Sequence, residues 1–234
     1  MNNHRLLIDT FKYKTIKKQM QLKGILFDMD GVLVDSEEYI FEATKLMLAE
    51  HGITAKKEDA SHFVGMGENK YITGIAKMNG FDVDIERDKA RTYQIYEEIS
   101  RGKLYALPGA LKFIEACVFK GLKLAVASSA DKVKVMINLR EIGLSGDNFQ
   151  AIVTGEDVEL KKPFPDIYIK AAKMIGLKPQ ECLVVEDAVS GVKAGKAAGA
   201  KCLALTTSFP ANLLGEADWI CENLASVPEK AICW

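Results

Sequence analysis

One pattern recurs through the C-terminal half of this 234-residue chain: an apolar run, a turn and an amphipathic helical stretch. Strands that alternate with helices in this way are typical of parallel βαβ units. The apolar runs of this half are Leu122–Ala127, Ala151–Val153, Cys182–Val185 and Lys201–Leu205, and its helical stretches are Ala110–Phe119, Lys132–Glu141, Asp166–Ile175 and Gly191–Ala198. One further apolar run, Gly24–Phe27, lies near the start of the chain. The sequence therefore predicts an α/β fold with a doubly wound parallel sheet.

The interval from Ser36 to about Leu107 breaks this alternation. It contains the helical patterns Glu37–Glu50, Lys70–Met78 and Asp88–Ser100 and no convincing strand. A helical insertion that follows the first strand and returns at Pro108-Gly109 would lie over the strand ends, where a lid can exclude water. We therefore predict an N-terminal extension over residues 1–20, an α/β core of residues 21–35 and 108–234, and a helical cap over residues 36–107.

Composition narrows the functional classes. The chain is 48% hydrophobic, as soluble globular proteins are, and its net charge of −1 gives no general attraction to nucleic acid or anionic membranes. Its five cysteines form no C-x-x-C pair, which indicates reduced thiols in a cytoplasmic protein. The basic first twenty residues lack the apolar centre of a secretory signal, so we interpret them as a surface extension. No apolar run approaches the length of a membrane span.

Two carboxylates follow the first apolar run, in the sequence Asp28-Met29-Asp30-Gly31. Residues two apart on a strand point the same way, so Asp28 and Asp30 would both project from the carboxyl end of a buried strand. Ligands bind at that end in open α/β sheets. Asp and Gly are also ordinary turn residues, so this motif alone leaves an acidic turn as an equal alternative.

Three further polar clusters follow other predicted strands. Ser128-Ser129 follows one, Lys162 lies in the extended Lys161-Lys162-Pro163 segment, and Glu186-Asp187 follows another. Each has an ordinary explanation by itself, namely a helix cap, a solvated charge or a turn. Together they converge on one crevice, since the carboxyl ends of parallel strands meet at one edge of the sheet. Clustered carboxylates repel one another unless a cation joins them, and oxygen ligands favour Mg²⁺.

These four clusters resemble the four motifs of the haloacid dehalogenase superfamily, in order, from about Leu22 to the C-terminus. The helical insertion resembles the cap of the subgroup that includes β-phosphoglucomutase and small-metabolite phosphatases. The resemblance implies that Asp28 is the nucleophile and Asp30 the general acid and base. It also implies that Mg²⁺ is held by the Asp28 carboxylate, the Asp30 backbone carbonyl and Asp187, with Glu186 ligating directly or through water. Phosphoryl oxygens would be bound by Ser128, by the backbone N–H of Ser129 and by Lys162.

The second acid of the first motif separates the possible reactions. Dehalogenases lack an Asp two residues after the nucleophile, so Asp30 favours phosphoryl transfer. Where β-phosphoglucomutase has a histidine after the first motif and a phosphate-gripping arginine in the first cap loop, this chain has Ile40 and Glu68. A carboxylate repels a second phosphate, which disfavours the mutase.

We therefore predict a Mg²⁺-dependent phosphatase, a phosphoric monoester hydrolase that acts on a small phosphorylated metabolite such as a sugar phosphate. A phosphohexomutase and a catalytically silent binding module remain the alternatives. Lys70 and Arg91 are candidate cap cations for the substrate, although such residues are more often solvent-facing helix charges. The cap sequence does not identify the substrate, and nothing in the sequence sets the oligomeric state.

Overall fold

The computed structural model describes residues 21–60, 62–63 and 67–234. The predicted extension over residues 1–20 lies outside them. Six parallel strands form one sheet in the order β3-β2-β1-β4-β5-β6. The strands are β1 (Gly24–Phe27), β2 (Lys123–Ala127), β3 (Ala151–Val153), β4 (Cys182–Glu186), β5 (Lys201–Leu205) and β6 (Trp219–Cys221). From β1 the chain first adds β2 and β3 on one side of the sheet and then adds β4, β5 and β6 on the other side. This change of side confirms the predicted doubly wound α/β fold.

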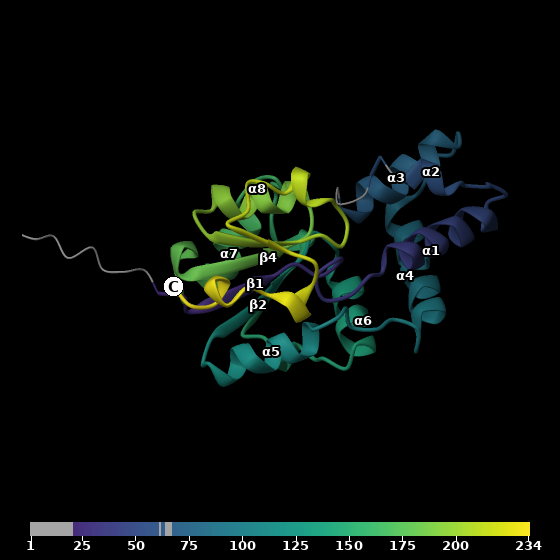
Figure 1. Ribbon diagram of the computed structural model, residues 1–234. Helices are drawn as coiled ribbons and strands as arrows, with labels where there is room; N and C mark the ends of the chain where they lie inside the picture. Colours follow the sequence, from purple (N-terminus) through teal and green to yellow (C-terminus); the bar gives the residue numbers. More distant parts are fainter. Residues whose placement is uncertain (1–20, 61, 64–66) are drawn as a thin grey trace, which may run out of the picture.

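Alternate side chains of β1 enter two different core layers. Ile25 and Phe27 face the layer that contains Phe113 of α5 (Ala110–Phe119), and Leu26 faces the layer that contains Tyr168 of α7 (Asp166–Met174). The Phe27 and Phe113 rings meet edge to face with centroids 6.0 Å apart. The helices that cover the sheet are α5 (Ala110–Phe119), α6 (Lys132–Glu141), α7 (Asp166–Met174) and α8 (Val189–Ala197), and Figure 1 shows α7 and α8 on the side of the sheet opposite α5. Because both faces are covered, the strands consist almost wholly of apolar residues.

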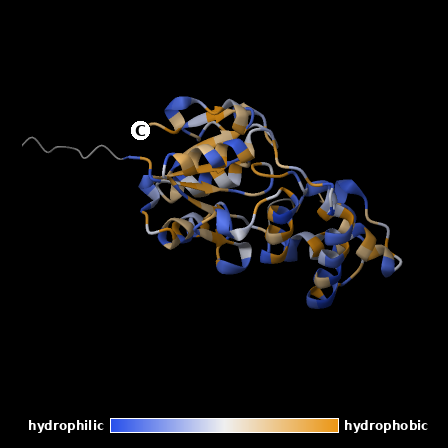
Figure 2. Cartoon of the chain, turned by 90° about the horizontal axis from the view of Figure 1, so that it is seen from below, coloured by the Kyte–Doolittle hydropathy of each residue, from blue (hydrophilic) through white to orange (hydrophobic). Residues whose placement is uncertain are grey.

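The segment between β1 and α5 is helical throughout its described elements. It contains α1 (Glu37–Glu50), α2 (Lys57–Ala60), α3 (Glu68–Met78) and α4 (Ile85–Ser100), which we call the cap. Figure 1 shows the cap beside the sheet-containing core, and Figure 2 shows apolar residues gathered inside both parts and polar residues on the outer helices. This arrangement confirms the predicted core with an inserted helical cap.

The two chain crossings between the core and the cap lie side by side. Val34 and Ala106 form an antiparallel bridge, and the Leu107 backbone N–H donates to the Leu33 carbonyl at 2.9 Å. The cap therefore begins and ends at one hydrogen-bonded pair of segments, next to the loop that contains Asp30. Among the described residues, no helix is both long and apolar enough to cross a membrane.

Candidate active site

The predicted core residues lie around one cavity of about 150 Å³ at the carboxyl ends of the strands. This volume is smaller than a drug-sized pocket and suits a small metabolite. Asp28 follows β1, Ser128 follows β2, and Glu186 is the last residue of β4. The predicted residues that line the cavity are Asp28, Asp30, Ser128, Ser129, Lys162, Glu186 and Asp187. Four motifs spread over 160 positions are thus brought together by the parallel sheet.

Lys162 joins the first and fourth motifs. Its ammonium donates to Asp28 Oδ1 at 2.8 Å and to Glu186 Oε1 at 2.6 Å. Burial alone would lower the pKa of Lys162, but the Asp28 and Glu186 carboxylates raise it above its ordinary value. The lysine is therefore a fixed, buried cation beside the proposed nucleophile.

Glu186 is completely buried and its two oxygens accept four hydrogen bonds. Oε1 accepts from Lys162 and from the Tyr168 hydroxyl, each at 2.6 Å. Oε2 accepts from the backbone N–H groups of Asp187 and Ala188 at 3.0 and 3.1 Å. With these bonds in place, Glu186 is suited to orienting Lys162, whereas Asp28 and Asp187 have oxygens available for another ligand.

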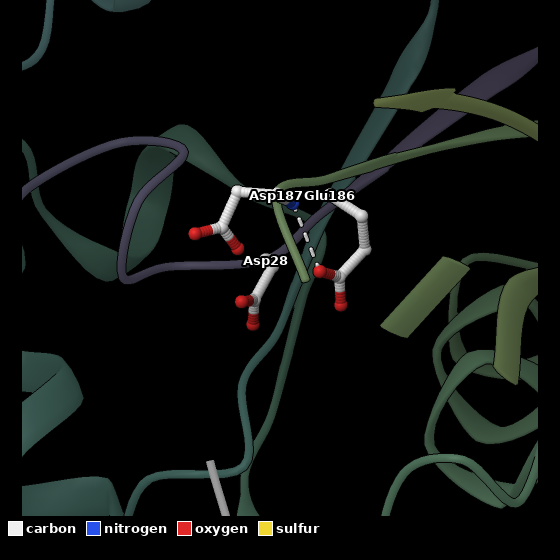
Figure 3. Close-up of side chains that lie close together, drawn as sticks. All are labelled: Asp28, Glu186 and Asp187. Carbon is white, nitrogen blue, oxygen red and sulfur yellow. Dashed lines mark hydrogen bonds between the residues drawn. The ribbon is translucent and has the colours of Figure 1, made fainter. Parts of the chain in front are cut away.

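Asp28, Glu186 and Asp187 point toward a common space (Figure 3), and each offers a carboxylate oxygen within 4.8 Å of the others. Burial raises the pKa of Asp28 to about 7, and it raises the pKa of Asp187, on which Glu186 and Asp28 also act by repulsion. A cation between the carboxylates would remove this repulsion. All the donors are hard oxygen atoms, so the residues fit Mg²⁺.

Two glycines allow these carboxylates to approach the backbone. Gly31 has a φ of 73°, and a Cβ atom there would overlap the Asp187 carboxylate. At Gly191, in the first turn of α8, a Cβ atom would overlap the Glu186 carboxylate. Side chains at either position would displace an acid from the cavity.

Asp30 is held by residues that sequence reasoning did not assign to the site. The Ser36 hydroxyl donates to Asp30 Oδ1, and the Lys134 ammonium donates to Asp30 Oδ2 at 3.0 Å. Ser36 in turn accepts from Asn138 Nδ2 at 3.3 Å, and Asn138 Oδ1 accepts from the Tyr96 hydroxyl of the cap. Ser36, Lys134, Asn138 and Tyr96 are all buried. A continuous hydrogen-bonded chain thus runs from the cap helix α4 to Asp30.

Ser208 was also missed at the sequence level, and its hydroxyl donates to Asp187 Oδ2. It lies after β5, beyond the four motifs. Its position in the sequence could have identified it, because a polar residue that follows a parallel strand lies at the same edge of the sheet as the four motifs. Lys134 could have been identified in another way, because a lysine among the apolar residues on the buried side of a helix needs an acidic partner.

The structure does not bring the two predicted cap cations to the cavity. Lys70 is exposed on α3, because that helix turns Glu68 and Tyr71 inward instead. Arg91 pairs with Glu50 at the end of α1, with its Nη2 2.7 Å from Glu50 Oε1. Neither residue lines the cavity, so the expectation that they contact the substrate is corrected.

Comparison with known proteins identifies the family. A sequence profile described as haloacid dehalogenase-like hydrolase matches residues 25–205, which is most of the chain. The chain belongs to this family. Hexitol phosphatase A from Escherichia coli (strain K12) is 33% identical over 210 residues, covering 89% of this chain and 94% of that protein. The predicted membership of the superfamily is therefore confirmed, together with the prediction of a phosphoric monoester hydrolase.

Two other proteins similar to this haloacid dehalogenase-like hydrolase differ in how much of their own length the match covers. The Arabidopsis thaliana protein SUPPRESSOR OF QUENCHING 1, chloroplastic, is 40% identical over 202 residues, which are 84% of this chain. The chain spans only 19% of that longer relative. A solved structure of a CbbY variant from Rhodobacter sphaeroides, in complex with xylulose-(1,5)bisphosphate, matches with a TM-score of 0.81 and 22% identity. It covers 92% of this chain and 100% of the CbbY chain, and shows that the two share a fold.

Proposed function

We propose that this chain is a Mg²⁺-dependent phosphatase that hydrolyses a small phosphorylated metabolite, a sugar phosphate, through an aspartyl-phosphate. The observation that carries the proposal is the meeting of Asp28, Asp30, Lys162 and an acidic cluster around one small cavity. Its relatives named as phosphatases of hexitols and of phosphorylated carbohydrates support a sugar-like substrate. The proposed location is cytoplasmic, which the five free cysteines support.

In the proposed first step, an Asp28 oxygen attacks phosphorus in line with the leaving oxygen. The new oxygen–phosphorus bond forms as the bond to the leaving oxygen breaks, and Asp30 transfers its proton to that oxygen. In the second step Asp30 takes a proton from water, which attacks phosphorus and releases phosphate from Asp28. One difficult displacement is thereby divided into two.

The remaining residues stabilise charge on the phosphoryl group. Lys162 is held beside Asp28, and Ser128 and Ser129 line the same cavity. Fixed donors aimed at the oxygens where negative charge spreads are worth about 3 kcal/mol each in related sites. When bound, Mg²⁺ would be held by Asp28, Asp187 and the Asp30 carbonyl and would neutralise charge on the transferring group.

The proposal is tested by measuring phosphate release from a panel of sugar phosphates, with and without Mg²⁺. We expect activity that requires Mg²⁺ and is lost in Asp28→Asn. Asp82→Asn is the matched control, since Asp82 is exposed on the cap and does not line the cavity. Absence of release from every sugar phosphate, or full activity in Asp28→Asn, would rule the phosphatase out.

The same assay separates the mutase alternative. Conversion of β-glucose 1-phosphate to the 6-phosphate, primed by a bisphosphate, would establish a phosphohexomutase. The structure gives the cavity a buried apolar side chain at Ile40 and a carboxylate at Glu68, neither of which binds phosphate. We therefore expect hydrolysis rather than isomerisation.

A further inference from the structure

Glu68 is a buried acid of the cap, and one of its carboxylate oxygens is unpaired in the part of the chain that the structure describes. It is 7% exposed, lines the cavity and lies at the start of α3. Its Oε1 lies 3.8 Å from Lys134 Nζ, whereas Oε2 has no hydrogen-bond partner among the described residues. Leaving a buried carboxylate oxygen unpaired is costly, so such a group usually has a function that supplies the missing donor.

Tyr71 lies on the same face of α3, three residues after Glu68. Its side chain is 5% exposed and lines the same cavity, and its hydroxyl interacts with the Glu37 carboxylate, which lines the cavity too. A carboxylate oxygen accepts hydrogen bonds, and a phenol that donates to one group can still accept from another. A group that pairs with both Glu68 and Tyr71 must therefore donate hydrogen bonds, as an alcohol does.

Lys134 places this pair opposite the proposed general acid. The lysine is 3% exposed on the core helix α6 and lies between Asp30 Oδ2 and Glu68 Oε1, at 3.0 and 3.8 Å. In the proposed reaction Asp30 gives its proton to the leaving oxygen. The rest of the leaving group must then lie on the Asp30 side of the phosphate, where the cap presents Glu68 and Tyr71.

The excess of acidic residues around the cavity disfavours a leaving group that carries a second phosphate. Seven acids and two lysines line it in the described structure: Asp28, Asp30, Asp35, Glu37, Glu68, Glu186 and Asp187 against Lys134 and Lys162. Each lysine already contacts two of these acids. A divalent cation would offset only part of the excess, so a second phosphate would find acids and no uncommitted lysine.

We propose that Glu68 and Tyr71, with Lys134 as a positioning residue, form a subsite for the hydroxyl groups of a neutral polyol or sugar leaving group. This subsite selects monophosphates over bisphosphates and over esters without hydroxyl groups. The inference rests on the proposed phosphatase function and adds the part of the cavity that recognises the substrate.

The test compares kcat/KM for three probes: sorbitol 6-phosphate, phenyl phosphate and fructose 1,6-bisphosphate. We expect the wild-type chain to prefer sorbitol 6-phosphate. Glu68→Ala and Tyr71→Phe should each lower the ratio of sorbitol 6-phosphate to phenyl phosphate by about tenfold, since each removes a hydrogen bond that only the polyol makes. Glu86→Gln, an exposed cap substitution outside the cavity, should leave the ratio unchanged.

An unaltered ratio in both Glu68→Ala and Tyr71→Phe would overturn the subsite, as would a wild-type preference for the bisphosphate. Tyr71→Phe keeps the ring and guards against a general loss of folding in the alanine variant. Using ratios within one variant also cancels differences in the fraction of active protein.

A binding measurement tests the subsite independently of the proposed reaction. In Asp28→Asn, calorimetry should show tighter binding of sorbitol 6-phosphate than of inorganic phosphate, and adding Glu68→Ala should abolish the difference. If this holds while the wild-type chain hydrolyses nothing, the phosphatase proposal fails and the subsite stands. If the sorbitol group adds no affinity, the subsite is wrong whatever the activity.

Discussion

The ammonium of Lys134 donates to Asp30 Oδ2 at 3.0 Å across 104 positions of sequence. The lysine belongs to helix α6 of the core, and its other close acid, Glu68, belongs to the cap. Burial alone would lower the pKa of Lys134, but Asp30 and Glu68 raise it well above its ordinary value. A permanent buried cation therefore joins Asp30 of the core to Glu68 of the cap.

Replacing Lys134 by Met should remove the shared counter-charge of Asp30 and Glu68. Breaking a buried ion pair on one side costs about 3 kcal/mol, and we expect this loss in urea unfolding. We expect kcat on a sugar phosphate to fall by about tenfold or more because Asp30 loses a donor that positions it. Lys132→Met, on the exposed side of the same helix, is the control. Equal stability and kcat in both variants would contradict a role for Lys134.

The chain from Tyr96 through Asn138 and Ser36 to Asp30 predicts a distant effect on catalysis. Asn138→Leu keeps the branched shape of the side chain but leaves the Tyr96 hydroxyl without its acceptor and Ser36 without a donor. We expect a stability loss of about 1–3 kcal/mol. We also expect kcat to fall more than KM rises, since Asn138 does not line the cavity. A purely structural residue would leave the kcat of the folded fraction unchanged.

Gly191→Ala should disable the site through Glu186. The added methyl group overlaps the Glu186 carboxylate, which then loses its bonds to Lys162 and to the backbone. We expect activity to fall at least about a hundredfold, comparable to losing a fixed donor to the transferring group. Gly215→Ala is the control, because a Cβ atom there meets nothing within 4 Å. Near-normal turnover in Gly191→Ala would show that Glu186 does not need its observed position.

The raised pKa values predict how the metal-free protein responds to pH. Burial raises the pKa of Asp28 and of Glu68 to about 7, above their unfolded values of 3.8 and 4.5. Between these limits the folded chain binds more protons than the unfolded chain, so these groups stabilise the fold as pH falls and destabilise it as pH rises through about 7.

With chelator present, Tm should therefore be higher near about pH 5.5 than near about pH 7.5, and Mg²⁺ should raise Tm more at the higher pH. Acids with lowered pKa values, such as Asp59 and Glu181, lose their contribution only at lower pH. Thermal unfolding followed by circular dichroism measures both effects. Asp28→Asn should reduce the pH dependence; a metal-free Tm that rises toward pH 7.5 would refute the assignment.

Much of the core was predictable from sequence because its strands are short apolar runs between helices. Helix α1 matches its predicted bounds, Glu37–Glu50, and α3 and α4 begin two and three residues earlier than predicted. Strand β6 was missed because it is an edge strand of only three residues, and no α-helix separates it from β5, so the alternation of apolar runs with helices does not mark it. Helix α2 is a single short turn with a polar sequence, KEDA, and gives no periodic signal.

The site was predictable where its residues follow strands and not where they reach it from elsewhere. Asp28, Ser128 and Asp187 follow strands that the apolar pattern locates, so topology alone brings them together. From α6, Lys134 contacts Asp30 and Asn138 contacts Ser36, and both contacts depend on how that helix packs. The positions of such side chains depend on tertiary packing, which periodicity does not specify.

The paired crossings at Val34 and Ala106 have a consequence for how such a protein diversifies. Because the cap leaves and rejoins the core at adjacent hydrogen-bonded segments, its whole sequence is one insertion in a single loop. Insertions whose ends are close together are well tolerated. A lineage can therefore exchange the whole cap, while inheriting Asp28 and the other residues at the strand ends unchanged.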